Sequence, residues 1–243
     1  MPRLLIAAAA VAGVMAMPAN SAPARRAPAK AHPATPAHAN WLMTIARTPE
    51  GGVRMGNPNA RITLIEYGSR TCPHCALFDA EGVPALKSSY IASGQLSYEF
   101  RDFPVHGVLD MGPILLGQCV STGRFFPMLN QMMAAQSQLM KKPEIPAAEQ
   151  EKLRALKPAP LIAYLANYYG YTDFATRHGL SPASARACLG DAKAIETIAK
   201  RADAANALYA IPGTPAFIVN GKLAKDVFDW KALQPILIAA GAK

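Results

Sequence analysis

The chain is expected to fold as one α/β domain interrupted by an inserted, all-helical subdomain. A strand-like segment at residues 61–67 is followed by a helix-like segment and by a second strand-like segment at residues 96–101. The next hundred residues show only helical periodicity, and strand-like sequence returns at residues 216–224. Because the strand signal resumes after the helices, the helices are predicted to lie within the α/β domain.

The N-terminal 22 residues have the pattern of a secretory signal peptide. Arg3 precedes an apolar run over residues 4–17, which small residues and prolines follow. The run is shorter than the roughly 20 residues that span a bilayer, so a cleaved signal is favoured over an uncleaved anchor. Residues 23–44, which are rich in Ala and Pro, predict a linker. The mature chain is therefore expected to be exported and periplasmic, where disulfides persist.

The net charge is weak evidence for a partner. Of 25 Lys and Arg residues, four lie in the first 40 residues, which contain no Asp or Glu. The folded part therefore carries 21 − 16 = +5. Because no nucleic-acid motif accompanies this charge, a solvated basic surface is predicted and no nucleic-acid partner.

Residues 61–67 predict a central strand, since they are apolar on both faces apart from Glu66. A helix is expected from Cys72 to about residue 89, with Pro73 tolerated in its first turn and a bend or an interruption near Gly82 and Pro84. Residues 96–101 alternate in polarity and predict a second strand, parallel to the first. The first part of the α/β domain is placed at residues 45–107.

The insertion is placed at residues 108–209 and the second part of the domain at 210–243. A hairpin is predicted at residues 216–224 and a closing helix at 229–240. The inserted helices are predicted at residues 110–121, 127–139, 147–156, 160–169, 181–189 and 191–210.

Cys72-Pro73-His74-Cys75 is the motif that carries chemistry. A thiol at a helix N-terminus is near free backbone N–H groups and the positive end of the helix dipole, and both favour the thiolate. Cys72 is so placed, and Cys75 lies one turn further along. The His74 imidazole can lower the Cys72 pKa further. A stable thiolate is a good leaving group, so the motif predicts a redox-active, oxidising disulfide.

Two other interpretations of this motif are weaker. A structural disulfide across so small a loop would contribute little chain entropy. A structural zinc site needs four ligands, and the other cysteines, Cys119 and Cys188, form no second CxxC pair. No metal and no cofactor are therefore predicted.

Together with the insertion, the CPHC motif and the later segment Gly213-Thr214-Pro215-Ala216-Phe217 resemble the DsbA-like thioredoxin-fold thiol:disulfide oxidoreductases. The resemblance covers about residues 57–243 and implies a thioredoxin fold. It also implies a cis Pro215 beside the cysteine pair, with Thr214 and Pro215 contacting substrate peptide. Without the resemblance, Thr214-Pro215 would be an ordinary trans turn.

In the resembled family, the residue matching Glu66 is a buried acid that helps to move the proton of the second cysteine. The sequence itself supports this role, because an acidic side chain on an otherwise apolar strand is costly to bury and such groups are common at functional sites. The alternative for Glu66 is an exposed carboxylate on an edge strand.

The remaining cysteines lie on two different predicted helices. With Cys72 paired to Cys75, one pairing is left for Cys119 and Cys188. Similar second disulfides in some members of the resembled family favour a structural bridge over two separate buried thiols.

The sequence thus predicts an exported thiol:disulfide oxidoreductase that donates its Cys72–Cys75 disulfide to reduced secreted substrate proteins. The resemblance implies that a membrane quinone-linked oxidase of the DsbB type reoxidises it. A periplasmic reductase or isomerase is the first alternative, although isomerases of this kind usually carry an N-terminal dimerisation domain for which the segment before Asn57 is too short. A peptide-binding holdase is the second. His106 and His178 have no paired ligands and receive no predicted role.

Overall fold

The computed structural model describes residues 40–243, which contain a six-stranded mixed sheet. The strand order is β1-β2-β4-β3-β5-β6. β3 and β4 are parallel, and every other neighbouring pair is antiparallel. The strands are β1 (Ile45–Arg47), β2 (Val53–Gly56), β3 (Ile62–Gly68), β4 (Leu96–Asp102), β5 (Ala216–Val219) and β6 (Lys222–Leu223).

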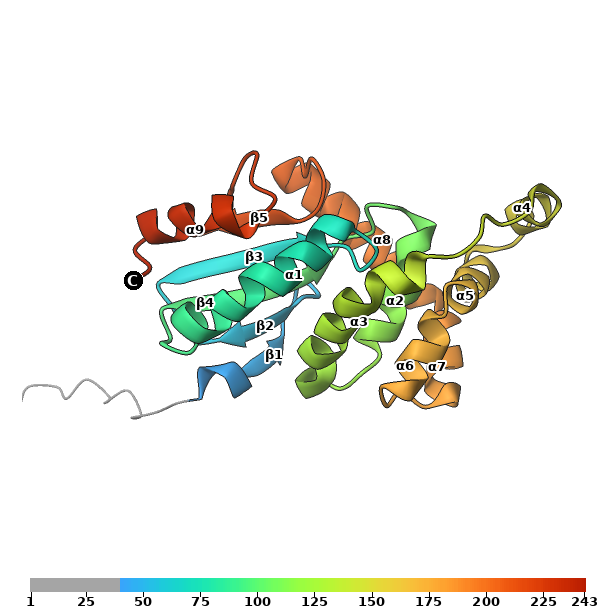
Figure 1. Ribbon diagram of the computed structural model, residues 1–243, viewed down its shortest axis with the longest axis horizontal. Coiled ribbons are helices and arrows are strands. Elements are labelled where there is room, and N and C mark those ends of the chain that lie inside the picture. The colour runs from blue at the N-terminus through green and yellow to red at the C-terminus, as the bar shows by residue number, and fades with distance from the viewer. Residues whose placement is uncertain (1–39) are drawn as a thin grey trace, which may run out of the picture. The chain divides into compact units, whose positions relative to one another are not determined.

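β3 lies inside the sheet, as its apolar sequence predicts. Its side chains alternate between the two faces. Leu64 belongs to the main core together with Phe78 of α1 (Pro73–Ala85), whereas Tyr67 packs in a second cluster with Ala205 of α8 (Ala192–Tyr209). In Figure 1, α1 crosses in front of the strands and α8 lies behind them. Glu66 is two residues after Leu64 and therefore points to the same face of the sheet, which α1 covers.

α1 continues through Gly82 and Pro84 without the predicted interruption. The hydrogen-bonding pattern changes two residues later, where a π-helical segment, η2, runs over Leu86–Ile91. Pro84 has no N–H to donate, and the Leu86 N–H contacts the carbonyls of both Gly82 and Val83. The segment thus stays helical to Ile91, just past its predicted end near residue 89.

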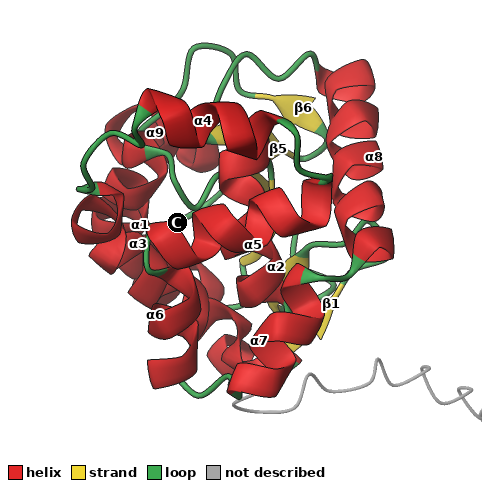
Figure 2. Ribbon diagram, turned by 90° about the vertical axis from the view of Figure 1, so that its right-hand side faces the viewer, coloured by secondary structure: helices red, strands yellow, loops and turns green. Residues whose placement is uncertain are grey.

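The predicted insertion, residues 108–209, consists of helices joined by loops, and it contains one helix that the periodicity missed. This helix, α6, has seven residues and follows Gly170, whose φ is 79°. It was too short for its periodicity to be recognised. Figure 2 shows these helices in front of the strands, and α4 extends away from its neighbours in Figure 1. Besides α8, the insertion comprises α2 (Val108–Gln118), η3 (Thr122–Arg124), α3 (Phe125–Met140), α4 (Ala147–Arg154), α5 (Pro158–Tyr168), α6 (Tyr171–Arg177) and α7 (Pro182–Leu189). The chain closes with α9 (Trp230–Ala239).

The sequence also failed to predict β1 and β2. Both are short, and Val53 of β2 pairs with Phe100 of β4, so these strands depend on a distant partner more than on their own propensity. Residues 41–43, within the predicted linker, form a 3-10 turn whose Trp41 and Leu42 pack against the core. The predicted signal peptide and the linker up to residue 39 lie outside the described residues. Within residues 40–243, no helix has the length and apolarity to cross a membrane.

Candidate active site

The two cysteines of the CPHC motif lie at the N-terminal end of α1. Cys72 is the N-cap residue, with an extended backbone, and Pro73 is the first helical residue. Both thiols are free, so the structure represents the reduced state. The Cys72 thiol contacts the Thr214 carbonyl oxygen at 3.2 Å, whereas the Ser69 N–H donates to the Cys75 sulfur at 3.4 Å. Cys75 is completely buried.

The two thiols differ in acidity. The pKa of Cys72 is lowered to about 5, first by a hydrogen bond from the Cys75 thiol and further by the backbone N–H groups of Cys75 and His74. These contacts outweigh burial, which acts in the opposite direction. The pKa of Cys75 is raised well above its ordinary value, chiefly because burial disfavours its charged form. At neutral pH the reduced site therefore holds a thiolate at Cys72 and a protonated thiol at Cys75.

The His74 side chain is exposed. The N–H that supports the Cys72 thiolate is a backbone group of this residue, and no hydrogen bond joins its imidazole to Cys72 among the described contacts. A role for the imidazole therefore stays a prediction.

Glu66 is buried, with 2% of its surface exposed, and it accepts a hydrogen bond of 2.6 Å from the Tyr98 hydroxyl. Burial raises its pKa to about 8, although the Tyr98 contact opposes this shift. Ionisation of Glu66 in turn contributes to the raised pKa of Cys75. Glu66 is thus a buried acid that holds its proton near neutral pH and is electrostatically coupled to the second cysteine. Its role in proton transfer stays a proposal.

The raised pKa of Glu66 predicts how stability depends on pH. Between pH 4.5 and about 8 the unfolded chain loses this proton while the folded chain keeps it, so the free energy of unfolding falls as the pH rises. Replacing Glu66 by Gln should remove that loss. We expect the free energy of unfolding of the oxidised E66Q variant, relative to that of wild type, to rise by about 3 kcal/mol between pH 4 and pH 7. Urea unfolding of both proteins at pH 4 and pH 7 measures this difference. A difference between the variant and wild type that did not change with pH would contradict the prediction.

The Thr214–Pro215 peptide bond is cis, and it leads directly into β5. Thr214 is buried, and its carbonyl is the group that contacts the Cys72 sulfur. The structure thus brings together five of the predicted site residues, Cys72, Cys75, Glu66, Thr214 and Pro215, although the last two lie more than 140 residues after Cys72. Contact of Thr214 and Pro215 with substrate stays a proposal.

Cys119 and Cys188 form a disulfide with a Cα–Cα distance of 6.3 Å. Cys119 is the C-cap residue of α2, and Cys188 lies in α7, so the bridge joins two inserted helices away from the CPHC motif. Within residues 40–243, no group of three or more His, Cys, Asp or Glu side chains is arranged to hold a metal ion.

Removal of this bridge should destabilise the protein without changing the redox motif. The cysteines are 69 residues apart, for which the chain-entropy model gives about 4 kcal/mol. We expect the C119S/C188S double variant to lose up to that amount in urea unfolding, compared with wild type at the same redox state of the CPHC motif. A loss below about 1 kcal/mol would show that the bridge hardly restricts the unfolded chain.

The sequence missed the residues that hold the segment before Cys72. Gln136 of α3 donates to the carbonyl oxygens of Arg70 at 3.1 Å and Cys72 at 3.0 Å. Arg70 is completely buried, and its Nε atom lies 2.7 Å from Asp102 at the end of β4. Only Arg70, a charged residue two positions before Cys72, could have drawn attention to this arrangement, and its partner Asp102 could not be chosen from the sequence.

Comparisons with known proteins concern the family and the fold of the chain. Residues 48–238 match the model of a family described as thioredoxin. A solved protein-disulfide isomerase from Novosphingobium aromaticivorans is 29% identical, with a TM-score of 0.72 over 76% of this chain and 95% of that one. Alpha-DsbA1 from Wolbachia pipientis is 21% identical, with a TM-score of 0.60 over 77% of this chain and 89% of that one, which is a likeness of fold.

A Rickettsia bellii (strain RML369-C) protein, provisionally named a protein-disulfide oxidoreductase, is 27% identical over 71% of this chain. The chain spans 58% of that protein's length and 54% of a similarly named one from Rickettsia typhi. The predicted thioredoxin fold with an inserted helical subdomain is confirmed by the family match and by these structural likenesses.

Proposed function

Since the chain belongs to the thioredoxin family, we propose that it is a thiol:disulfide oxidoreductase that donates its Cys72–Cys75 disulfide to reduced substrate proteins and so promotes their oxidative folding. The names of its relatives support this class of enzyme. The observation that carries the proposal is the opposite shift of the two thiol pKa values, because a thiolate stabilised at Cys72 makes the disulfide oxidising.

The reaction proceeds in two exchanges. A substrate thiolate attacks the Cys72 sulfur, the Cys72–Cys75 bond breaks, and Cys75 leaves with the electron pair. Glu66, which keeps its proton near neutral pH, gives that proton to the Cys75 thiolate. A second substrate thiolate then attacks the substrate's own sulfur in the mixed disulfide. Cys72 leaves as the stabilised thiolate, and the substrate carries a new disulfide.

The location and the partners follow from this function. Disulfide donation needs an oxidising compartment, and the predicted signal peptide would deliver the chain to the periplasm. The proposed partners are reduced secreted proteins as substrates and a membrane quinone-linked oxidase of the DsbB type as the source of oxidising equivalents.

A reductase or isomerase is the second candidate, and the name of the Novosphingobium aromaticivorans protein favours it. The same site would then act mostly in its reduced form, attacking substrate disulfides through Cys72. The reduction potential separates the two functions. Replacing both Cys72 and Cys75 distinguishes a peptide-binding holdase from either redox enzyme, since a holdase should still bind peptides without these cysteines.

The deciding experiment equilibrates Cys72–Cys75 with glutathione and titrates the reduced thiolate by its absorbance near 240 nm. We expect a potential well above the roughly −270 mV of thioredoxin. We expect the thiolate signal to disappear on acidification through about pH 5, and a C72S variant to lack that transition. A potential at or below that of thioredoxin would move the chain to a reductive or isomerising role.

A further inference from the structure

A polar cluster outside the CPHC motif holds the residue before Cys72. Asp110, in the first turn of α2, is completely buried. Its carboxylate accepts hydrogen bonds from the Ser69 hydroxyl at 2.7 Å, from the Thr71 hydroxyl, and from the His106 backbone N–H at 2.7 Å. The Thr71 hydroxyl is also 2.7 Å from Nδ1 of His106. One buried acid thus organises both the residue that precedes Cys72 and a histidine.

These contacts determine which ring nitrogen of His106 carries the proton. A hydroxyl has one proton to donate, and the Thr71 proton goes to the Asp110 carboxylate, which can only accept. The Thr71 oxygen must therefore accept from His106, so Nδ1 carries the hydrogen. Nε2 then has a free lone pair and is the basic nitrogen of the ring.

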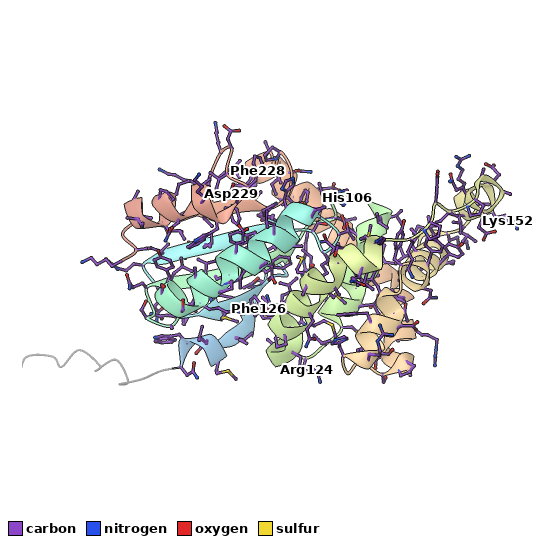
Figure 3. The ribbon with its side chains drawn as sticks, in the orientation of Figure 1. His106, Arg124, Phe126, Lys152, Phe228 and Asp229 are labelled. Carbon is purple, nitrogen blue, oxygen red and sulfur yellow. A yellow bond between two sulfur atoms is a disulfide. The ribbon has the colours of Figure 1, made fainter. Side chains whose placement is uncertain are left out.

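The free nitrogen belongs to a partly exposed side chain that contacts Thr71, the residue before Cys72. The His106 side chain is 44% exposed, and Figure 3 shows it beside the N-terminal end of α1. Residues 103–105, directly before it, line a surface hollow of about 390 Å³ together with residues 211–213, directly before Thr214. The loop before His106 and the loop before Thr214 therefore face the same hollow, and the Thr214 carbonyl contacts the Cys72 sulfur.

We propose that His106 is a further catalytic residue, whose Nε2 accepts the proton of the substrate thiol that attacks Cys72, and that Thr71 and Asp110 position it. This inference rests on the proposed function. Proton transfer turns the substrate thiol into the attacking thiolate and His106 into an imidazolium ion. The Cys72–Cys75 bond then breaks as described above, and the imidazolium returns its proton to solvent.

The surroundings suit an imidazolium in that step. Nδ1 of His106 lies 3.8 Å from Oδ2 of Asp110, close enough for the buried carboxylate to stabilise the cation. Cys72 follows Thr71 in the chain, and Asp203 of α8 lines the hollow next to residues 103–105. Nucleophilic thiols and hydroxyls are commonly activated by a base that a third group orients. Here the substrate thiol would be the nucleophile, His106 the base, and Thr71 with Asp110 the orienting group.

The size of the effect has an upper bound. An ordinary thiol with a pKa of about 8.5 is roughly 3% ionised at pH 7, so complete ionisation would raise the attack rate by about 30-fold. The advantage shrinks as the pH rises and vanishes near pH 10, where the substrate thiol is ionised in solution. A catalytic base here therefore has a characteristic pH dependence.

The test is the His106→Asn variant of the full chain. The Asn side-chain amide can still donate to Thr71 in place of Nδ1–H, but it has no basic nitrogen. The oxidised protein is mixed with an excess of a reduced two-cysteine peptide, and the loss of its Cys72–Cys75 disulfide is followed by stopped flow from pH 5 to 10. We expect H106N to be about five- to thirtyfold slower than wild type at pH 7 and equal to it at pH 10.

His178→Asn is the matched control, since His178 stacks on Phe174 away from the motif, and it should follow wild type at every pH. An H106N profile that coincides with wild type, or one lowered equally at pH 7 and pH 10, would overturn the role of His106 as a base. A wild-type protein that leaves the peptide reduced at every pH would overturn the oxidase proposal itself, and this inference with it.

A second measurement needs no variant. Long-range ¹H–¹⁵N correlation spectra of the histidine-labelled protein at pH 8 report which ring nitrogen is protonated. We expect Nδ1–H for His106. A protonated Nε2 would leave no free base toward the substrate and would overturn the proposal.

Discussion

Replacement of Cys72 by Ser is expected to abolish oxidation of a two-cysteine peptide completely. Without Cys72 the active disulfide cannot form, and the remaining thiol, Cys75, is completely buried with a raised pKa. No reactive thiolate is then accessible at the start of α1. Peptide oxidation is measured by mass spectrometry after incubation with protein that has first been treated with oxidised glutathione. Any residual activity above a few per cent of wild type would contradict the assignment of Cys72 as the attacked sulfur.

The matched variant, Cys75→Ser, should behave differently. It keeps Cys72 at the helix N-terminus, where the backbone N–H groups of His74 and residue 75 still stabilise a thiolate. With a disulfide-containing substrate protein, the Cys72 thiolate should therefore attack one sulfur, release the other as a thiolate, and leave a mixed disulfide that accumulates because Cys75 is absent and cannot resolve it. Non-reducing gels detect these species. If C72S trapped substrate and C75S did not, the roles of the two cysteines would have to be exchanged.

Replacement of Arg70 by Met is expected to be the most destabilising change outside the cysteines. Arg70 lies completely buried against Asp102, with N–O distances of 2.7 and 3.3 Å, and its guanidinium also packs over the ring of Phe125. Met fills a similar volume but leaves the Asp102 charge without its partner. Breaking a buried pair in this way costs about 3–5 kcal/mol. Urea unfolding of the oxidised protein measures the loss.

Arg154→Met is the matched control. Arg154 also lies 2.7 Å from a carboxylate, that of Glu151, but both side chains are more than 70% exposed. Exposed pairs contribute between 0 and about 1 kcal/mol, so this variant should unfold almost as wild type does. Equal losses for the two variants would mean that burial does not determine the contribution of the Arg70–Asp102 pair.

The chemistry of the site could be predicted from the sequence because most of it is local. Cys72, Pro73 and the following residues form one helical turn, and the effect of a helix N-terminus on a thiol needs no distant partner. The unusual acid on an apolar strand likewise indicated the burial of Glu66, which the structure shows at 2% exposure. The return of strand-like sequence at residues 216–224 indicated an insertion before any contact was known.

The supporting contacts could not be predicted in this way. Thr71 meets Asp110 across 39 residues, and Gln136 meets the Cys72 carbonyl across 64. Several polar residues on the inserted helices could have filled these positions, and periodicity does not say which helix faces the CPHC segment. His106 received no role for the same reason, since its partner, Thr71, lies in another loop of the sequence.

Local sequence therefore determined most of the elements, their order and the identity of the reactive pair, because propensity, helix capping and thiol chemistry act over a few residues. Tertiary packing alone decided that β1 and β2 form, that Arg70 is neutralised by Asp102, and that Asp110 aligns Thr71 with His106. These features need groups far apart in the chain to be desolvated together. The free energy of such contacts depends on which surfaces meet, and a sequence pattern does not contain that information.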